Sequence, residues 1–155
     1  MSWQDMYVSV DALQVARASA ALLAAGAWDA APTELNCEHA SSVTLFLSYT
    51  RGAAGGVFDF QIQVSPYSAD GLAAAGAAVW LMQSVYLSGG VVPGADTVSN
   101  VQREIVRYGS TAVGQEGFIY GPVELAVGAQ RLRVRAREAG VVGTPGTLQI
   151  EVMFS

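Results

Sequence analysis

Two stretches of the chain alternate, with few exceptions, between apolar and polar side chains. The first covers residues 43–65, "VTLFLSYTRGAAGGVFDFQIQVS", in which two alternating runs flank the glycine-rich loop "RGAAGG". A period of two places every second side chain on the same face of a half-buried strand. Pairing Tyr49 with Phe58 sets each apolar residue of the first run opposite an apolar residue of the second. The pattern therefore predicts a β-hairpin.

The second stretch lies at the C-terminal end, "RLRVRAREAGVVGTPGTLQIEVMFS". Its first run alternates four arginines with apolar residues, and its second alternates Gln, Glu and Met with apolar residues. The turn chemistry "GVVGTPG" separates the two runs. A register that pairs Val134 with Ile150 also sets Arg133 opposite Glu151, which is a favourable cross-strand pair. We predict a second hairpin, with the arginines on one face.

The remaining segments give weaker patterns. Residues 79–87 and 117–127 are typical of strands, whereas residues 99–108, "SNVQREIVRY", fit either a strand or a helix. Residues 11–26, "DALQVARASAALLAAG", have a helix-forming composition that tertiary contacts can override, and a short N-terminal helix stays open. Several short strands separated by Gly and Pro turns predict an all-β fold, an antiparallel β-sandwich or jelly roll. One domain spans residues 1–155, with residues 1–10 as an N-terminal arm.

The composition indicates a surface with few charged residues. The 155 residues are 52% hydrophobic and 14% charged, with a net charge of −5 and no lysine. Such a chain buries a full core without metal or disulfide, and its surface is typical of an assembly subunit whose partners cover part of it. No signal peptide opens the chain, and no stretch reaches the roughly 20 apolar residues of a membrane span. We expect synthesis in the host cytoplasm and no membrane partner.

The sequence offers no catalytic or metal-binding signature. Cys37 and His39 are the only residues of their kinds. In an extended strand they would lie on the same face roughly 7 Å apart, too far for a nucleophile and its base. One Cys and one His cannot form a zinc site in one chain, and no phosphate-binding loop precedes a helix. We therefore predict a protein that is not an enzyme and needs no cofactor or metal.

The four arginines of residues 131–137 are the strongest surface signal. Nucleic-acid binding is disfavoured, because the rest of the chain is acidic and the strand has no aromatic residues for base stacking. Two interpretations stay open, a solvent-exposed strand face and a docking stripe for an acidic protein. The candidate partner interface comprises Trp3, Tyr7, Arg131, Arg133 and Arg135.

The tryptophans leave a choice between packing and binding. Trp80 is typical of a core residue and Trp28 of a staple that pins a loop, whereas both would also suit a sugar-binding face.

The segments "SVTLFLSYTRGAAGGVFDFQIQVSPYSADG" and "RLRVRAREAGVVGTPGTLQIEV" together resemble small β-sandwich structural proteins of tailed phages. The resemblance covers residues 40–65 and 130–152 and carries no functional residues. It implies a virion component, foremost a capsid decoration (cement) protein that binds between subunits of the major capsid protein and stabilises the head. It also implies a homo-oligomer, for example a trimer. The alternative is a tail or fibre module that recognises host glycans, and a hydrolase with a hidden carboxylate pair is a third hypothesis.

Overall fold

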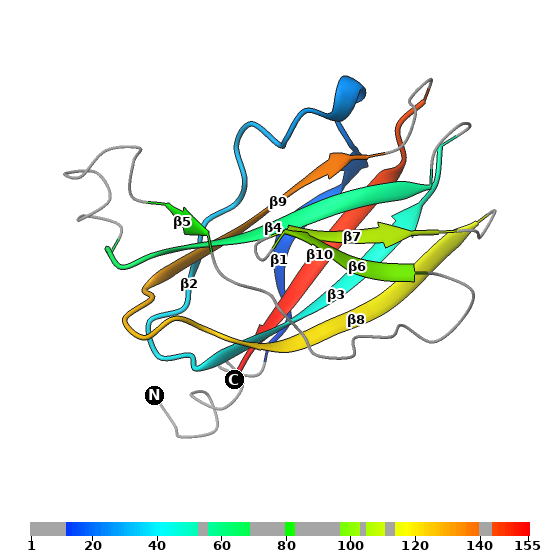
Figure 1. Ribbon diagram of the computed structural model, residues 1–155. Coiled ribbons are helices and arrows are strands. Elements are labelled where there is room, and N and C mark those ends of the chain that lie inside the picture. Colours follow the sequence, from blue (N-terminus) through cyan, green and yellow to red (C-terminus); the bar gives the residue numbers. More distant parts are fainter. Residues whose placement is uncertain are drawn as a thin grey trace.

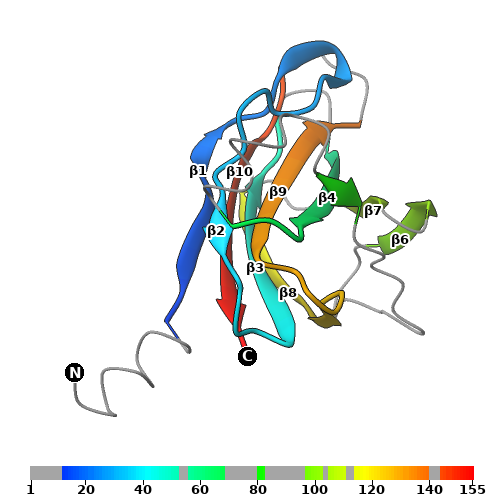
Figure 2. The same ribbon diagram turned by 90° about the vertical axis from the view of Figure 1, so that its left-hand side faces the viewer.

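Two antiparallel sheets pack face to face in the computed structural model, which describes residues 12–52, 56–68, 80–82, 97–102, 105–110, 114–139 and 144–155 (Figure 1). Sheet A has the strand order β1-β10-β3-β8, and sheet B has the order β2-β9-β4-β7-β6, with β5 pairing β4 beside β7. Figure 2 shows the two layers edge-on, with β1 and β10 on one side and β4, β7 and β6 on the other. The predicted all-β sandwich is confirmed.

The strands have the following bounds: β1 Gln14–Ala21, β2 Leu35–Asn36, β3 Ser42–Thr50, β4 Val57–Ser65, β5 Leu81–Met82, β6 Thr97–Gln102, β7 Ile105–Gly109, β8 Gln115–Glu124, β9 Arg131–Glu138 and β10 Thr147–Phe154. Four pairs are nested around the middle of the chain: β1 with β10, β2 with β9, β3 with β8, and β4 with β7. Successive pairs alternate between the two sheets. This winding is that of a jelly roll, with β5 and β6 added between β4 and β7.

The apolar halves of the alternating strands meet between the sheets. The inward-facing side chains of β3, β4, β9 and β10 are all buried, as a period of two requires. An aromatic cluster crosses the sandwich. The ring centroids of Tyr49 and Phe58 lie 4.6 Å apart, and those of Tyr108 and Phe118 lie 4.0 Å apart in a stack. Burial of these rings supplies much of the apolar area that stabilises the fold.

The first predicted hairpin is wrong. Strand β3 pairs with β10 and β8, whereas β4 pairs with β9 and β7 in the opposite sheet. Tyr49 and Phe58 do meet as expected, but through their side chains across the core rather than through backbone hydrogen bonds. A period of two shows which face of a strand is apolar. It does not show whether the next strand in the sequence pairs with it in the same sheet or packs against it from the opposite sheet.

The second predicted hairpin is also wrong. Strand β9 pairs with β4, so that Arg133 lies opposite Gln63 and Arg135 opposite Gln61, and neither lies opposite β10. Glu151 instead lies opposite Phe46 of β3 on the outer face of sheet A. In a jelly roll, the strands before and after this turn belong to different sheets, so the turn residues alone cannot fix their pairing.

The two ambiguous segments form strands. The segment expected as a helix or a strand near the N-terminus is strand β1, followed by a single 3-10 turn at Ala24–Gly26. Its edge position beside β10 and the burial of Ala16 and Leu22 outweigh the helical propensity of its alanines. Residues 97–102 and 105–109 form β6 and β7, and β8 passes through a cis peptide bond at Gly121-Pro122. The expected N-terminal arm lies outside the described residues.

No helix among the residues that the structure describes has the length and hydrophobicity to cross a membrane.

The observed strand pairing predicts which pairs of introduced cysteines can form a disulfide. The double substitution Ser48→Cys with Gln149→Cys places both thiols on paired, half-exposed positions of β3 and β10. Opposite residues have Cα atoms about 4.5–5.5 Å apart, within the range of a disulfide. We expect the bond to form under mild oxidation, measured as loss of two free thiols.

The matched control is Arg135→Cys with Gln149→Cys, which joins the two strands that a β9–β10 hairpin would pair. Those residues lie on the outward faces of different sheets. A disulfide in the control and not in the first variant would contradict the jelly-roll order.

Candidate functional site

The outer face of β4 is polar and yet fully covered. Asp59 and Ser65 have no exposed surface, and Gln61 and Gln63 are nearly as buried. Because the other face of β4 lies in the core, this strand is buried on both sides. Buried polar groups destabilise a fold unless they form hydrogen bonds, so the polar face of β4 needs donors above it. Four arginines supply them.

The arginine layer consists of Arg107 of β7 and Arg133, Arg135 and Arg137 of β9, which flank β4 on its two sides. Each arginine of β9 sits in register with a polar residue of β4. Arg133 Nε donates to Gln63 Oε1 at 2.7 Å, and Arg135 Nε donates to Gln61 Oε1 at 2.6 Å. The alternation of both strands therefore produces a ladder of cross-strand hydrogen bonds on the outside of sheet B.

Asp59 is the centre of this layer. Arg107 lies opposite it on β7 and donates from Nε at 2.8 Å and from Nη2 at 3.1 Å. Arg137 lies opposite it on β9 and donates from Nε at 2.8 Å. The hydrogen bond to Asp59 raises the pKa of Arg107. One buried carboxylate therefore ties together the three adjacent strands β9, β4 and β7.

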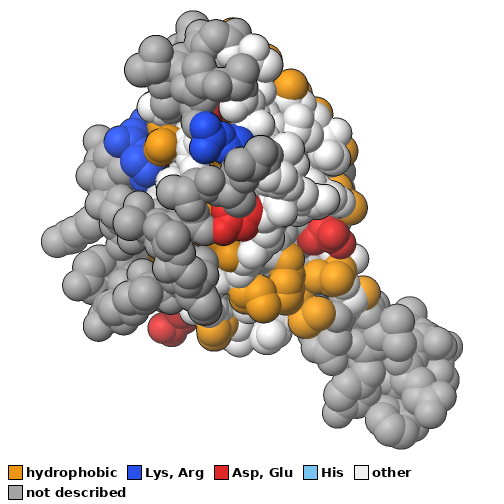
Figure 3. Space-filling view, turned by 90° about the vertical axis from the view of Figure 1, so that its right-hand side faces the viewer, with side chains coloured by type: hydrophobic (Ala, Val, Ile, Leu, Met, Phe, Trp, Pro, Cys, Tyr) orange, Lys and Arg blue, Asp and Glu red, His pale blue; other side chains and the backbone are white. Residues whose placement is uncertain are grey.

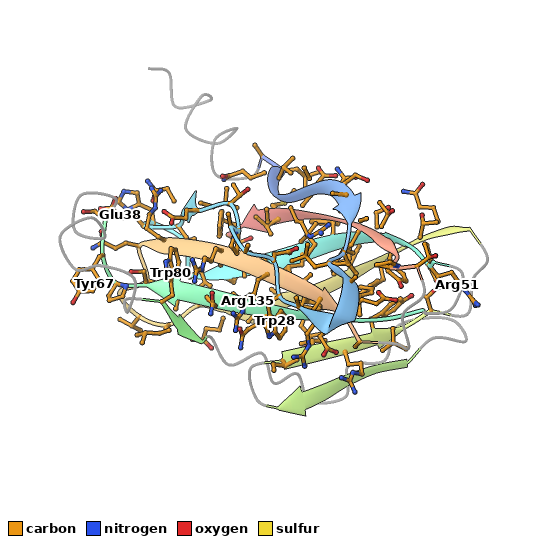
Figure 4. All side chains as sticks on the ribbon, turned by 90° about the horizontal axis from the view of Figure 1, so that it is seen from above. Trp28, Glu38, Arg51, Tyr67, Trp80 and Arg135 are labelled. Atoms are coloured by element: carbon orange, nitrogen blue, oxygen red, sulfur yellow. The ribbon has the colours of Figure 1, made fainter. Side chains whose placement is uncertain are left out.

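Two tryptophans lie on top of the arginine layer. The Arg133 guanidinium lies 4.3 Å from the ring centre of Trp80, and those of Arg135 and Arg137 lie 4.6 Å and 4.4 Å from that of Trp28. Such cation–π contacts contribute about 0.5–2 kcal/mol each, depending on desolvation. Figure 4 shows Trp80, Arg135 and Trp28 following one another along β9. The expectation that Trp80 packs in the core is wrong, because both rings are half-buried on the outside of sheet B.

Asp29 holds Trp28 in place. The Asp29 N–H donates to Ala136 O at 3.1 Å, and the Ala136 N–H donates to Asp29 Oδ2 at 3.0 Å. This carboxylate also accepts from Arg17 of β1, with Nε at 2.9 Å and Nη2 at 3.2 Å. Because β1 belongs to sheet A and Ala136 to sheet B, the segment carrying Trp28 is fastened to both sheets. The expected role of Trp28 as a staple agrees with this arrangement.

The arginine layer is only partly neutralised. Asp59 accepts from two of its four guanidiniums, whereas Arg133 and Arg135 bind neutral amides. The Nη groups of Arg133 and Arg135 donate to no acceptor within the described residues. Desolvation lowers the pKa of both side chains, and the positive charge of a neighbouring arginine acts in the same direction, whereas the negative charge of Glu34 partly offsets the shift of Arg133.

The sequence-predicted interface residues have different environments. Arg131 reaches Glu34 at 3.7 Å, and its buried Nε has no acceptor in the described part of the chain. Arg133 and Arg135 belong to the layer beneath the tryptophans, so the expected cross-strand partner Glu151 and the open, solvent-exposed face are both wrong. Trp3 and Tyr7 lie outside the described residues. The docking of an acidic protein on the arginines stays a prediction.

The environment of Cys37 does not activate its thiol. Cys37 is buried, and burial raises the pKa of its thiol to about 11, so that it is protonated at neutral pH. A nucleophilic cysteine needs the opposite shift. Cys37 and His39 line a surface depression of about 300 Å³ together with Asn36 and Glu38. Within the described ranges, no three His, Cys, Asp or Glu side chains come together as a metal site.

A second buried carboxylate lies at one end of the core. Glu138 is 1% exposed and accepts hydrogen bonds from Tyr49 Oη at 3.2 Å and from the backbone N–H groups of Gly56 and Gly146. Desolvation raises the pKa of Glu138, against the effect of these hydrogen bonds. The side chain joins β9 of sheet B to β3 of sheet A where the two strand-connecting loops meet. Gly146 has no room for a Cβ, since the Tyr49 ring lies directly against it.

The sequence contains a pattern that predicts the arginine layer, although the two predicted hairpins did not use it. In β4, Asp59, Gln61 and Gln63 alternate with apolar residues, as the arginines do in β9. Pairing these two strands places an acceptor opposite every arginine of β9, whereas the predicted β9–β10 register sets Met153 opposite Arg131. Matching the polar faces as well as the apolar ones would have identified β4 and β9 as neighbours.

The chain matches no protein-family model, and neither the curated proteins nor the solved structures include a match to it.

The burial of Asp59 between two arginines predicts that its substitution strongly destabilises the fold. We expect Asp59→Asn to lower the free energy of unfolding by about 3 kcal/mol, because it leaves Arg107 and Arg137 without their shared counter-charge. Urea denaturation measures the change. Glu151→Gln removes a half-exposed carboxylate that forms no ion pair within the described residues, and it should change stability by less than about 0.5 kcal/mol. Equal effects of the two substitutions would contradict the assignment.

Glu138 predicts a pH dependence of stability. Its folded-state pKa is raised, so the stability it contributes is fully present below the unfolded-state pKa and is lost as pH rises through the folded value. Glu138→Gln removes this loss. We expect the variant to gain stability relative to the natural protein between pH 4 and pH 8, measured as the difference in unfolding free energy. A difference that does not change with pH would show that the carboxyl is not titrating in the folded core.

Proposed function

We propose that the protein is a non-enzymatic structural component of a tailed-phage particle, a decoration protein that binds the head between capsid subunits. Attachment to the assembled shell, and not to free subunits, would stabilise the shell by mass action. The observation that carries the proposal is the outer face of sheet A, whose described side chains are nearly all uncharged and include exposed apolar residues.

The outer face of sheet A carries exposed apolar side chains in one row. Ile119 of β8 is 62% exposed and lies opposite Phe46 of β3, which is half-buried. Glu151 follows on β10 and then Val15 of β1, which is 46% exposed. Figure 3 shows, on the side that it presents, a group of hydrophobic side chains lying apart from the basic ones. Exposed apolar groups of this kind mark interaction surfaces.

The polar residues of this face also suit contact with another protein. The outward-facing side chains of β3 and β10 are uncharged except for one carboxylate and include no basic group: Ser42, Thr44, Phe46, Ser48, Thr50, Thr147, Gln149, Glu151 and Met153. A face with so few charges suits an interface core, where charged residues are depleted. Sheet B, by contrast, has its outer face occupied by arginines and tryptophans of its own chain.

The jelly-roll order supports this class of function without assigning it. Jelly rolls recur in viral capsid and lectin domains, and one fold hosts many functions. We expect the protein to act as a homo-oligomer, because repeated attachment sites on a symmetric shell favour a symmetric ligand. The alternative, a tail or fibre module that recognises host glycans, is favoured by a different surface, the tryptophans on sheet B.

The attachment face is tested by a charge introduced at its most exposed apolar residue. We expect Ile119→Glu to abolish co-sedimentation with shells assembled from the major capsid protein of the same genome, since a carboxylate would be buried unpaired in the contact. Thermal unfolding of the shells measures the same loss, because the natural protein should raise their melting temperature and the variant should not.

The matched control is Val127→Glu. Val127 is fully exposed in the loop between β8 and β9, away from the strands of sheet A that carry the row. The control should bind shells like the natural protein. If both variants bind unchanged, the outer face of sheet A is not the attachment surface. If the natural protein itself fails to bind, the decoration function is wrong.

A further inference from the structure

The arginine layer holds more positive charge than its carboxylate neutralises. Asp59 is the only carboxylate hydrogen-bonded to the four guanidiniums within the described residues; Arg133 and Arg135 donate only to amides, and Glu34 acts on Arg133 through its charge without a hydrogen bond. This excess lies in a protein whose net charge is −5. Half-buried cations without a counter-charge are costly, and a bound anion relieves that cost.

The guanidiniums of Arg133 and Arg135 are also held in a fixed orientation. Gln63 accepts from Nε of Arg133 and Gln61 from Nε of Arg135, and no residue that the structure describes accepts from their terminal Nη groups. Two N–H groups on one edge of a guanidinium match the two oxygens of a carboxylate. Preorganised side chains lose little conformational entropy when a ligand binds.

The tryptophans add flat apolar surfaces to these donors. Trp80 stacks on Arg133 and Trp28 on Arg135 and Arg137, and both indoles are half-exposed. Arg133 and Arg137 are four residues apart on β9, which corresponds to roughly 13 Å of surface. An arrangement of apolar rings with a few convergent polar groups is typical of a ligand site. The faces of sugar rings pack well on indole rings.

We propose that the outer face of sheet B, formed by Trp28, Trp80, Arg133 and Arg135, binds an acidic oligosaccharide through its carboxylates. The indoles take the sugar rings, and the Nη groups of the two arginines take the carboxylate oxygens. The site lies on the sheet opposite the proposed attachment face, so a protein attached through sheet A keeps this surface outward. This glycan site goes beyond the decoration function and does not depend on it.

A nucleic acid fits this surface less well. The affinity of a protein for nucleic acid comes from contacts with many phosphates in a row. Here the excess positive charge is confined to one layer, and the net charge of the remaining residues is more negative than that of the whole chain. A neutral sugar would leave Arg135 without a carboxylate partner and Arg133 with only the charge of Glu34.

The first experiment compares two probes that differ only in charge. Oligogalacturonate and its methyl ester have the same sugar rings, but the ester has no carboxylates. We expect the purified natural protein to bind oligogalacturonate with quenching or shift of its tryptophan fluorescence, and to bind the ester at least tenfold more weakly in isothermal titration calorimetry. Raising the salt concentration should weaken binding of the acid and leave the ester unchanged.

The second experiment compares two arginine variants. Arg135→Gln should weaken oligogalacturonate binding at least tenfold. Arg51→Gln removes the same charge at the end of the sandwich away from Trp80, as Figure 4 shows, and should bind like the natural protein. If Arg135→Gln does not fold, Trp80→Leu provides the comparison, with circular dichroism as the check on both folds.

Three outcomes would overturn the proposal. The natural protein fails to bind oligogalacturonate, it binds the acid and the ester equally, or it binds a short single-stranded DNA more tightly than the acid. Each outcome is independent of shell binding through sheet A, so the glycan site and the decoration function can fail separately.

Discussion

Asp59 is the residue on which the outer half of the molecule depends. It has no exposed surface, and it accepts hydrogen bonds from Arg107 on one neighbouring strand and Arg137 on the other. A carboxylate can be buried on the outside of a sheet only because these two cations compensate its lost hydration. The same contact joins β9, β4 and β7, lays Arg107 and Arg137 across the outer face of β4 and gives Trp28 a surface to stack on.

The sequence predicted the fold class and the faces of the strands but not their neighbours. The alternation in β3, β4, β9 and β10 identified the core residues correctly, because burial of one face imposes a period of two whatever the partner strand. Both hairpins failed for one physical reason. A jelly roll sends strands that are consecutive in the sequence to opposite sheets, so Tyr49 and Phe58 meet across the core instead of along it. Helical propensity was likewise outweighed in β1 by its pairing with β10.

Only part of the candidate site could be predicted from the sequence. The arginines of β9 were singled out, but their partners were sought on β10, and Asp59, Gln61 and Gln63 were taken only as the polar side of a hairpin. Trp28 and Trp80 come from segments far from β9 in the sequence, so only the fold brings them onto Arg133 and Arg135. The result is a protein with two unlike faces, a nearly uncharged face with exposed apolar side chains on sheet A and a basic, aromatic face on sheet B.

Sheet B carries a preformed layer of fixed and incompletely neutralised guanidiniums, and NMR of the arginine Nε–H groups is the most direct test of this layer. We expect separate, slowly exchanging signals for Arg133, Arg135 and Arg137, because each Nε–H donates to a residue of β4. On addition of oligogalacturonate, the signals of Arg133 and Arg135 should shift while that of Arg51 stays in place. Signals that coincide with free arginine and exchange rapidly with water would show that the guanidiniums are not held on β4.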